Sequence, residues 1–584
     1  MNQPPGGQAA DAAGAGAAFA SAAAELTGTL ADEGVQHLFI NPGTDTAPVQ
    51  EALAAARKDG TAHPRAILCT HEFVALSSAM GHYFATGTPQ AVMVHVDAGT
   101  LNLGGALHNA QRNRVPAVIF AGRTPYSISP DIPGHRDTAI HWQQEQLDQQ
   151  AVVRAFGKWT MEVPRGRDLG GIVRRAYQVA QTHPRGLAYV MLPREALMEP
   201  TGPGLARRLP PPRAAAPDPA ALAEAAQCLA RADRPVIVTD RAGTRPGTVA
   251  CLVEIADLLG CPVIDHRDRV SFPQRHPLYA GDGDALLREA DVVLLLDCEV
   301  PWIPAQVSPP PSATVLQIDI DPVKATMPTW TYPVDLAIAA DTSLALPLLA
   351  EELQALATPE RAARWRERRE QVCERLAQAR GQWEALAGSA EPGAAADAML
   401  AALNRALPPE AVVLAETVTN KAAMVRQLDR EPGSYFDTGS PALGWAVGGA
   451  LGVKLARPSA PVFAVCGDGA FNFGVPTAAI WSAQRAGAPF ISVILNNRAY
   501  RASRLPVQRL YPGGAADAEG TFPETDLGPP PSYPDLARAY GGDGRVVRSP
   551  GEIAAAVEEC LAIEASGRCA VLDIQLPTGD AGGA

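Results

Sequence analysis

Two stretches near the carboxyl end of the 584-residue chain decide the fold: VFAVCGDGAF at residues 462–471 and FISVILNNRAY at residues 490–500. Each begins with an apolar run typical of a buried strand and then turns polar, and a helical pattern joins the two. A strand, a helix and a second strand predict a βαβ unit with parallel strands. Because parallel strands end at one edge of their sheet, we expect Asp468 and Asn497 to lie close together.

The residues at this edge favour binding of a metal ion and a diphosphate. A carboxylate and an amide oxygen suit Mg²⁺, which prefers hard oxygen ligands. Gly467 and Gly469 would let the backbone approach a diphosphate, and the free N–H groups at the start of the next helix would receive it. A Gly-Asp-Gly turn alone is common between a strand and a helix. The prediction therefore depends on its combination with the Asn-Asn pair after the second strand.

Apolar runs and helical patterns alternate through the whole chain. This predicts an α/β protein with parallel sheets flanked by helices. A Pro-rich stretch at residues 199–219 and a charged helical stretch at residues 360–388 divide the chain into three domains, predicted at residues 1–198, 215–355 and 390–584. The predicted strands are residues 37–40, 66–69, 91–95, 117–121, 188–192, 235–239, 262–264, 292–296, 314–318, 411–415, 462–465, 490–495 and 570–574.

Composition excludes several classes of protein. The formal net charge of −13 argues against broad nucleic-acid binding, which needs a basic face. No run of 18 apolar residues occurs, so we expect no membrane span. The nine cysteines form no CxxC pair, which argues against a disulfide framework or a structural zinc site. Lys and Arg are absent before Arg57, so we expect a soft N-terminus without a secretory signal and a cytoplasmic location.

The Gly-Asp-Gly turn, followed one βαβ unit later by Asn-Asn, resembles the diphosphate-binding motif of thiamine diphosphate-dependent enzymes. The resemblance implies that Asp468, Asn497 and the carbonyl of Ala499 bind Mg²⁺. It also places Gly469, Ala470 and Tyr500 near the diphosphate. The interval between Asp468 and Asn497 is about two residues longer than in the usual decarboxylase pattern. The extra residues fall near 474–476, which predicts an irregular first turn of the helix.

The resemblance also implies a glutamate after a strand of the first domain, and Glu72 follows the apolar run 66–69. This carboxylate would hydrogen-bond the aminopyrimidine ring and favour the imino tautomer that removes the C2 proton of the thiazolium. Without the resemblance, capping of a helix would explain Glu72 better. In the segment 440–445, Leu443 would lie beneath the bent cofactor. The carbonyl of Pro441 would accept a hydrogen bond from the 4′-amino group.

The resemblance covers nearly the whole chain and implies a pyrimidine-binding, a middle and a diphosphate-binding domain. Members of this family work as dimers or dimers of dimers. We therefore expect a homodimer or homotetramer in which Glu72 of one subunit and Asp468 of another share an active site. The turn after residues 236–239 lacks a glycine run, so we expect no FAD.

Within the family, the sequence is most similar to benzoylformate decarboxylase and the acetolactate synthase-like group. His95 matches a decarboxylase histidine and could relay protons, although a histidine satisfied within its own turn is the alternative. Thr44 matches a substrate-facing serine, with a turn-stabilising threonine as the alternative. A second decarboxylase histidine has no counterpart in residues 297–304, which puts benzoylformate itself in doubt.

We therefore expect a thiamine diphosphate- and Mg²⁺-dependent decarboxylase or carboligase that acts on a small 2-oxo acid or aldehyde. The alternative is an acetolactate synthase-like transferase that joins two 2-oxo acids. Residues 126–150 and 498–531 are long enough to gate the site. His135 and His141, in the first of these segments, are predicted to be solvated.

Overall fold

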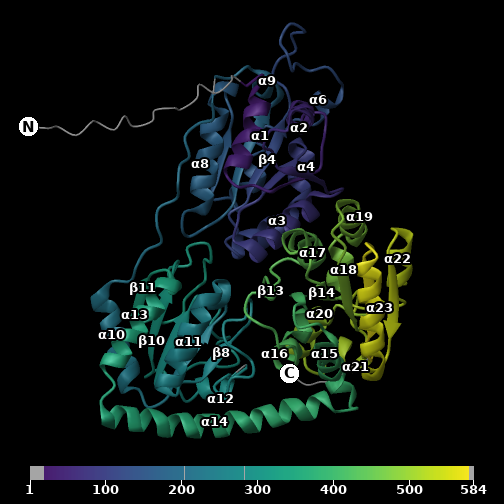
Figure 1. Ribbon diagram of the computed structural model, residues 1–584. Helices are drawn as coiled ribbons and strands as arrows, with labels where there is room; N and C mark the ends of the chain where they lie inside the picture. Colours follow the sequence, from purple (N-terminus) through teal and green to yellow (C-terminus); the bar gives the residue numbers. More distant parts are fainter. Residues whose placement is uncertain (1–18, 203, 282, 578–584) are drawn as a thin grey trace, which may run out of the picture.

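The computed structural model describes residues 19–202, 204–281 and 283–577. It contains three α/β domains, each built around one sheet in which all strands are parallel (Figure 1). Helices flank each sheet, which confirms the predicted fold class. The predicted start of the first domain and the predicted soft N-terminus lie in residues 1–18, outside the described residues.

The first domain has a six-stranded sheet with the order β2-β1-β3-β4-β6-β5. Its strands are β1 (His37–Ile40), β2 (Arg65–Leu68), β3 (Ala91–Val94), β4 (Val118–Arg123), β5 (Trp159–Glu162) and β6 (Ala188–Pro193). Its helices are α1 (Ala22–Asp32), α2 (Ala47–Asp59), α3 (Glu72–Thr86), α4 (Val96–Asn102), α5 (Gly104–Arg112), α6 (Ile140–Gln143), α7 (Ala151–Arg154), η1 (Gly166–Asp168), α8 (Leu169–Gln181) and α9 (Arg194–Met198). Every residue of the central strand β3 is buried, as expected for a sheet covered on both faces.

The middle domain has a five-stranded sheet with the order β11-β10-β9-β7-β8. Its strands are β7 (Pro235–Thr239), β8 (Val263–Asp265), β9 (Val292–Leu296), β10 (Thr314–Asp319) and β11 (Leu336–Ala339). Its helices are α10 (Pro219–Arg231), η2 (Ala242–Thr244), α11 (Pro246–Leu259), α12 (Asp284–Leu287) and α13 (Thr342–Ala355). Asp218 caps α10 by accepting the backbone N–H of Ala221, and Gly260 ends α11 with a φ of 61°.

The long helix α14 (Pro359–Ala387) bridges the middle and third domains (Figure 1), as the charged stretch predicted. Near its start, Arg368 donates hydrogen bonds to the carbonyls of Leu259 and Ala232 in the middle domain. Near its end, the carbonyl of Trp383 accepts a hydrogen bond from Gln427 of the third domain. The helix is therefore attached at both ends.

The third domain has a six-stranded sheet with the order β13-β12-β14-β15-β17-β16. Its strands are β12 (Val412–Glu416), β13 (Tyr435–Asp437), β14 (Val462–Gly467), β15 (Ile491–Asn496), β16 (Asp543–Val547) and β17 (Ala570–Gln575). Its helices are η3 (Pro392–Ala394), α15 (Ala395–Ala406), η4 (Val418–Asn420), α16 (Lys421–Gln427), α17 (Trp445–Ala456), α18 (Asp468–Phe473), α19 (Pro476–Ala486), α20 (Arg501–Leu510), α21 (Ala515–Glu519), α22 (Tyr533–Ala539), η5 (Pro550–Glu552) and α23 (Ile553–Ala565). When the strands are numbered along the chain within each domain, their order across this sheet is the same as in the first domain.

The strand order reverses between β1 and β3, between β7 and β9, and between β12 and β14. Open parallel sheets bind ligands in the crevice at the carboxyl ends of the strands where this reversal occurs. The fold therefore has one such position in each domain, where a ligand site is expected.

Helices α3 and α17 join the first and third domains (Figure 1). Ser78 of α3 donates a hydrogen bond to the carbonyl of Gly448 at 2.9 Å. A Cβ on Gly452 would lie 1.8 Å from the carbonyl oxygen of Ser78, and one on Gly81 would lie 2.0 Å from that of Gly449. Only glycine permits this close approach, which places one continuous hydrophobic core across both domains.

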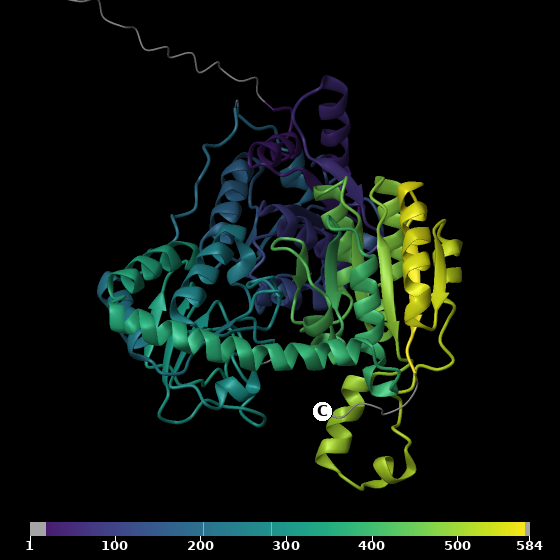
Figure 2. The ribbon, with the colours of Figure 1, turned by 60° about the horizontal axis from the view of Figure 1, so that its bottom comes forward.

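The segment that contains α20 and α21 extends from the body of the third domain beyond α14 (Figure 2, yellow-green). None of the described side chains in these two helices is buried. In the described part of the chain, no helix combines the length and the apolar character needed to cross a membrane.

Candidate functional site

Glu72 is the first residue of α3 and lies at the carboxyl edge of the first sheet, where it is 3 % exposed. Its Oε1 accepts a hydrogen bond from Asn41 at 2.9 Å, and its Oε2 accepts one from Asn102 at 3.1 Å. Asn41 directly follows β1, and Asn102 ends α4. A Cβ on Gly99 would lie 2.9 Å from Oε1. The carboxylate is thus held at both oxygens in a confined space.

His95 follows β3 at the same edge and is fixed at both ring nitrogens. Its Nδ1 forms an ion pair with Asp45, and its Nε2 lies 2.8 Å from Oε1 of Gln144. Burial lowers the pKa of His95, but the hydrogen bond and charge of Asp45, together with Gln144, outweigh it and raise the pKa above its usual value. The arrangement therefore favours a protonated imidazole.

Asp45 is itself almost fully buried, at 1 % exposure. Its Oδ2 has no hydrogen-bond partner, and a Cβ on Gly122 would lie 1.4 Å from this oxygen. A Cβ on Gly43 would lie 2.0 Å from Nδ1 of His95. The two glycines therefore make room for the Asp45–His95 pair.

Thr44 places its hydroxyl 3.3 Å from Nε2 of His141. The prediction that His141 is solvated is wrong, because this side chain is only 3 % exposed and its Nδ1 lies 3.4 Å from Asp137. The segment 126–150 folds back so that His141 of α6 reaches Thr44, in the loop after β1. This segment also brings Gln144 to His95.

Asp468 begins α18 at the carboxyl end of β14 and is 2 % exposed. Its Oδ1 accepts the backbone N–H of Gly469, whereas its buried Oδ2 has no hydrogen-bond partner. Burial raises the pKa of Asp468 to about 6. An unpartnered carboxylate oxygen in such a site suits a divalent cation.

Asn497 follows β15, which pairs with β14 in parallel register. Its Oδ1 accepts the backbone N–H of Ala499 at 3.0 Å. A Cβ on Gly469 would lie 2.6 Å from the ring of Tyr500, so the two segments meet closely. Asp468 and Asn497 therefore lie at neighbouring strand ends, as the spacing predicted.

The predicted irregularity after Asp468 is present in the structure. The helix stops at Phe473 and restarts at Pro476, and Val475 between them has a φ of 49°. A Cβ on Gly444 would lie 2.6 Å from the Cα of Gly474. The interruption therefore lets this turn pack against the segment that contains Pro441 and Leu443.

The segment 438–445 is held from two sides. Asn109 of α5 donates a hydrogen bond to the carbonyl of Ala442 and accepts one from its backbone N–H. Glu416, at the end of β12, accepts the backbone N–H groups of Gly444 and Ala446. Leu443 is half-buried and Pro441 is exposed. The polar groups that hold this loop were not predicted from the sequence.

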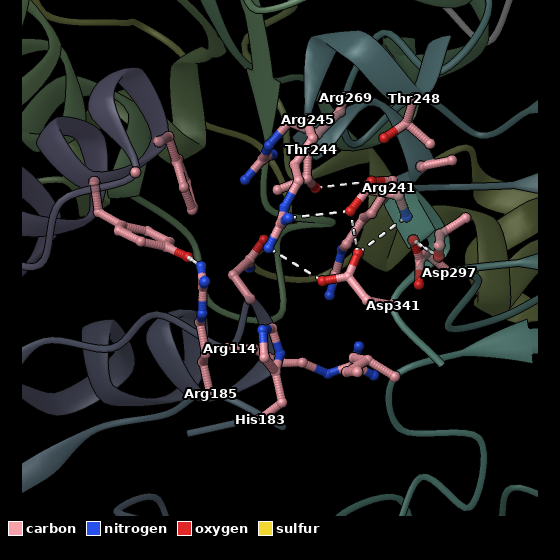
Figure 3. A pocket seen from close by; sticks show the side chains of 18 residues that line it. Arg114, His183, Arg185, Arg241, Thr244, Arg245, Thr248, Arg269, Asp297 and Asp341 are labelled. Atoms are coloured by element: carbon pink, nitrogen blue, oxygen red, sulfur yellow. Dashed lines mark hydrogen bonds and ion pairs between the residues drawn. The ribbon is translucent and has the colours of Figure 1, made fainter. Parts of the chain in front are cut away.

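The two groups of residues are attached to different domains. In the structure, Glu72 and His95 bind partners in the first domain, whereas Asp468 and Asn497 bind partners in the third. A cavity of about 380 Å³ between the first and middle domains is a separate feature (Figure 3). Arginines line it, but several are paired, such as Arg245 with Asp341 at 3.1 Å.

Comparisons with known proteins cover most of the chain. Models of the thiamine pyrophosphate enzyme family match residues 20–152 with the N-terminal TPP binding domain, 222–349 with the central domain and 417–574 with the C-terminal TPP binding domain. Thiamine pyrophosphate is another name for thiamine diphosphate.

Individual relatives are similar over nearly their full length. The chain is 28 % identical over 555 residues to benzoylformate decarboxylase from Pseudomonas aeruginosa, covering 92 % of this chain and 95 % of that protein. It is 28 % identical to sulfoacetaldehyde acetyltransferase from Rhodobacter capsulatus, covering 86 % of each. A solved 4-hydroxybenzoylformate decarboxylase from Rhodococcus jostii has the same fold, with a TM-score of 0.78, 22 % identity and coverage of 96 % of this chain and 100 % of that one.

The three family domains match in the order that the three sheets follow along the chain. In such a family the fold alone does not establish the function, which depends on the residues of the site. The family models cover the segments that contain Glu72 and Asp468. The chain therefore belongs to the thiamine pyrophosphate enzyme family.

Proposed function

We propose that this chain is a thiamine diphosphate- and Mg²⁺-dependent 2-oxo acid decarboxylase, with carboligation as a second outcome of the same chemistry. The observation that carries the proposal is His95, whose ring is held at both nitrogens by Asp45 and Gln144 at the sheet edge that also carries Glu72, and whose raised pKa suits a proton donor. Relatives that are named decarboxylases support it.

The third domain has residues that fit the cofactor and its metal. Asp468, Asn497 and the carbonyl of Ala499 would hold Mg²⁺, and the buried unpartnered oxygen of Asp468 supports this role. Gly467, Gly469, Ala470 and Tyr500 would surround the diphosphate. Leu443 would support the rings, and the Pro441 carbonyl would accept a hydrogen bond from the amino group.

The first domain provides the groups that move protons. When bound, thiamine diphosphate supplies the electron sink that lets CO₂ leave a 2-oxo acid. Glu72 would exchange a proton with the aminopyrimidine, and Asn41 and Asn102 fix its two oxygens for this task. His95 would protonate the carbon that has lost CO₂, which gives an aldehyde. Thr44 would orient the substrate through its hydroxyl.

A homodimer or homotetramer would bring the two groups together across a subunit interface. Several large apolar side chains near both groups are exposed in the single chain, among them Leu101, Trp142 and Phe473. Where such side chains adjoin one another, they are typical of a surface that another protein covers. We infer that a second copy covers them.

Substitution of Glu72 tests the proton-transfer role. Glu72→Gln keeps the size of the side chain but cannot accept and return a proton. We expect near-normal binding of thiamine diphosphate by calorimetry, with a loss of turnover of roughly 10²–10⁴-fold. Glu51→Gln, on the exposed face of α2, is the matched control. Full turnover by the Glu72 variant would overturn the assignment.

A panel of 2-oxo acids, aromatic and aliphatic, tests the reaction class when both CO₂ and the organic product are measured. Release of CO₂ with an aldehyde as the product supports the decarboxylase. Similarity to an acetyltransferase and to acetolactate synthases favours a second candidate, a transferase that passes the two-carbon unit to another acceptor. Acetolactate formed from pyruvate would establish that candidate instead.

A further inference from the structure

The carboxyl edge of the middle sheet carries a cluster that the proposed function does not use. Asp240 follows β7, His266 follows β8, and Cys298 is the second residue after β9. These strands are neighbours in the order β9-β7-β8, and the strand order reverses between β7 and β9. One ligand atom from each of the three residues lies within 4.8 Å of the other two. The cluster therefore lies at the strand ends where open parallel sheets commonly bind ligands.

Asp240 keeps one oxygen without a partner. The side chain is 5 % exposed, and its Oδ2 accepts the backbone N–H of Glu299 at 2.7 Å. Its Oδ1 is buried and receives no N–H or O–H group, and the thiol of Cys298 is the side chain that faces this carboxylate. An unpartnered buried acceptor costs about 1–3 kcal/mol, so a native structure usually has a reason for it.

His266 makes one ring hydrogen bond, which leaves its other ring nitrogen available to a metal ion. Its Nε2 lies 3.2 Å from the carbonyl oxygen of Pro301, and a hydrogen bond there requires the proton on Nε2. In the neutral ring, Nδ1 then has a free lone pair. Histidines that bind metals commonly donate their other N–H to a carbonyl in this way.

Cys298 completes the ligand set with a free thiol that is 1 % exposed. A thiolate, an imidazole and a carboxylate suit Zn²⁺, whereas the thiolate disfavours Mg²⁺. The positive charge of Arg241 acts on Asp240, and that of Lys324 acts on Cys298. Both cations are already paired with other carboxylates. Arg241 binds Asp268 at 3.1 Å, and Lys324 binds Asp319 at 2.6 Å.

We propose that Asp240, His266 and Cys298 bind a Zn²⁺-class transition-metal ion. Bonds of about 2.0–2.3 Å to a tetrahedral ion put ligand atoms roughly 3.3–3.7 Å apart, so the side chains need to close by no more than about 1.5 Å around it. Three protein ligands leave the fourth position for water. Arg241 and Asp297 face the cavity between the first and middle domains (Figure 3), whereas their sequence neighbours Asp240 and Cys298 do not line it. The bound ion would therefore hold the ends of β7, β8 and β9 together beside that cavity.

Titration with Co²⁺ tests the proposal, because a thiolate ligand gives a charge-transfer absorption band that oxygen ligands do not. The full-length protein, loaded with thiamine diphosphate and excess Mg²⁺, is titrated with Co²⁺ alone. We expect a thiolate band that saturates at one ion per chain and is removed by competing Zn²⁺. No band in the wild-type protein would overturn the proposal.

Variants identify the ligands. Cys298→Ser should abolish the band, and His266→Asn and Asp240→Asn should each weaken Co²⁺ binding by at least about 100-fold. Cys261→Ala, which removes another buried thiol of the same domain, is the matched control and should keep the band. Asp468→Ala should also keep it, which separates this site from the cofactor site. A band that survives Cys298→Ser would overturn the proposal.

Discussion

Asp45 and His95 show how one contact sets the chemistry available to a side chain. Asp45 comes from the turn after β1, and His95 comes from the end of β3. The turn brings the carboxylate against Nδ1 of His95, and Gln144 fixes the other nitrogen. The pair thus stabilises the charged ring despite its burial.

Asp45→Asn should lower the pKa of His95. As a proton donor, His95 loses activity when the pH rises through its pKa, so this limb of the kcat profile should move to lower pH in the variant. His135→Gln is the control, because Nδ1 of His135 lies next to the carbonyl of Ile132 within its own loop. Profiles of kcat against pH give the measurement. An unchanged limb in Asp45→Asn would contradict the role of Asp45.

Glu416 has a second residue-scale consequence, which concerns stability. Burial raises its pKa to about 8, although the N–H groups of Ala446 and Gly444 oppose this. The folded state therefore keeps a proton that the unfolded chain releases above about pH 4.3. The contribution of protonated Glu416 to the free energy of unfolding is complete below that pH and is lost as the pH rises through about 8.

Glu416→Gln removes this titration. Without cofactor, the wild type should lose stability relative to the variant by about 1.4 kcal/mol per pH unit between the two pKa values. Thermal unfolding of both proteins from pH 5 to pH 8 measures the difference. A difference that does not change with pH would show that Glu416 keeps no proton when folded.

At the scale of elements, the ends of the predicted strands located the candidate site residues better than any single motif did. Glu72, Asp468 and Asn497 each follow a buried apolar run, so the sequence located them at one edge of their sheets. Glu416 follows the apolar run 411–415 in the same way but was overlooked. Asp45, Gln144 and His141 could not be found in this way. Their roles depend on how loops and distant strands pack, as in the 97 residues that separate Thr44 from His141.

The sequence also missed four strands, and all of them lie at sheet edges: β5, β11, β13 and β16. Edge strands have a neighbour on one side only and need less apolar sequence. In β5 every residue is only partly buried, and β11 alternates between buried and exposed positions. The central strands, buried on both faces, were all predicted.

The crossing of α3 and α17 permits a prediction at the same scale. Gly452→Ala places a Cβ against the backbone of Ser78, which cannot move away cheaply. We expect a destabilisation of about 1–3 kcal/mol. Gly381→Ala, in α14 with no atom near its new Cβ, should instead stabilise by about 0.5–1 kcal/mol. Thermal midpoints compare the two, and equal effects would contradict the close approach.

At the scale of the whole molecule, the assembly of the active site can be tested by mixing inactive subunits. Glu72→Gln and Asp468→Ala should each be inactive alone. If each site joins two chains, random mixed dimers contain one intact site, and activity should recover to about a quarter of the wild type. Each variant mixed with itself is the control. If subunit exchange is demonstrated but activity does not recover, each site belongs to one chain.

The shared core of α3 and α17 also has consequences for how the molecule unfolds and for how its sequence can evolve. The first and third domains are far apart in sequence but share one hydrophobic cluster and are expected to unfold together, whereas the clusters of the middle domain and α14 include only Val425 from the third domain. The middle domain is thus an insertion within a two-part body. Its surface can diverge, or acquire and lose ligands, without disturbing the glycine contacts that hold the body together.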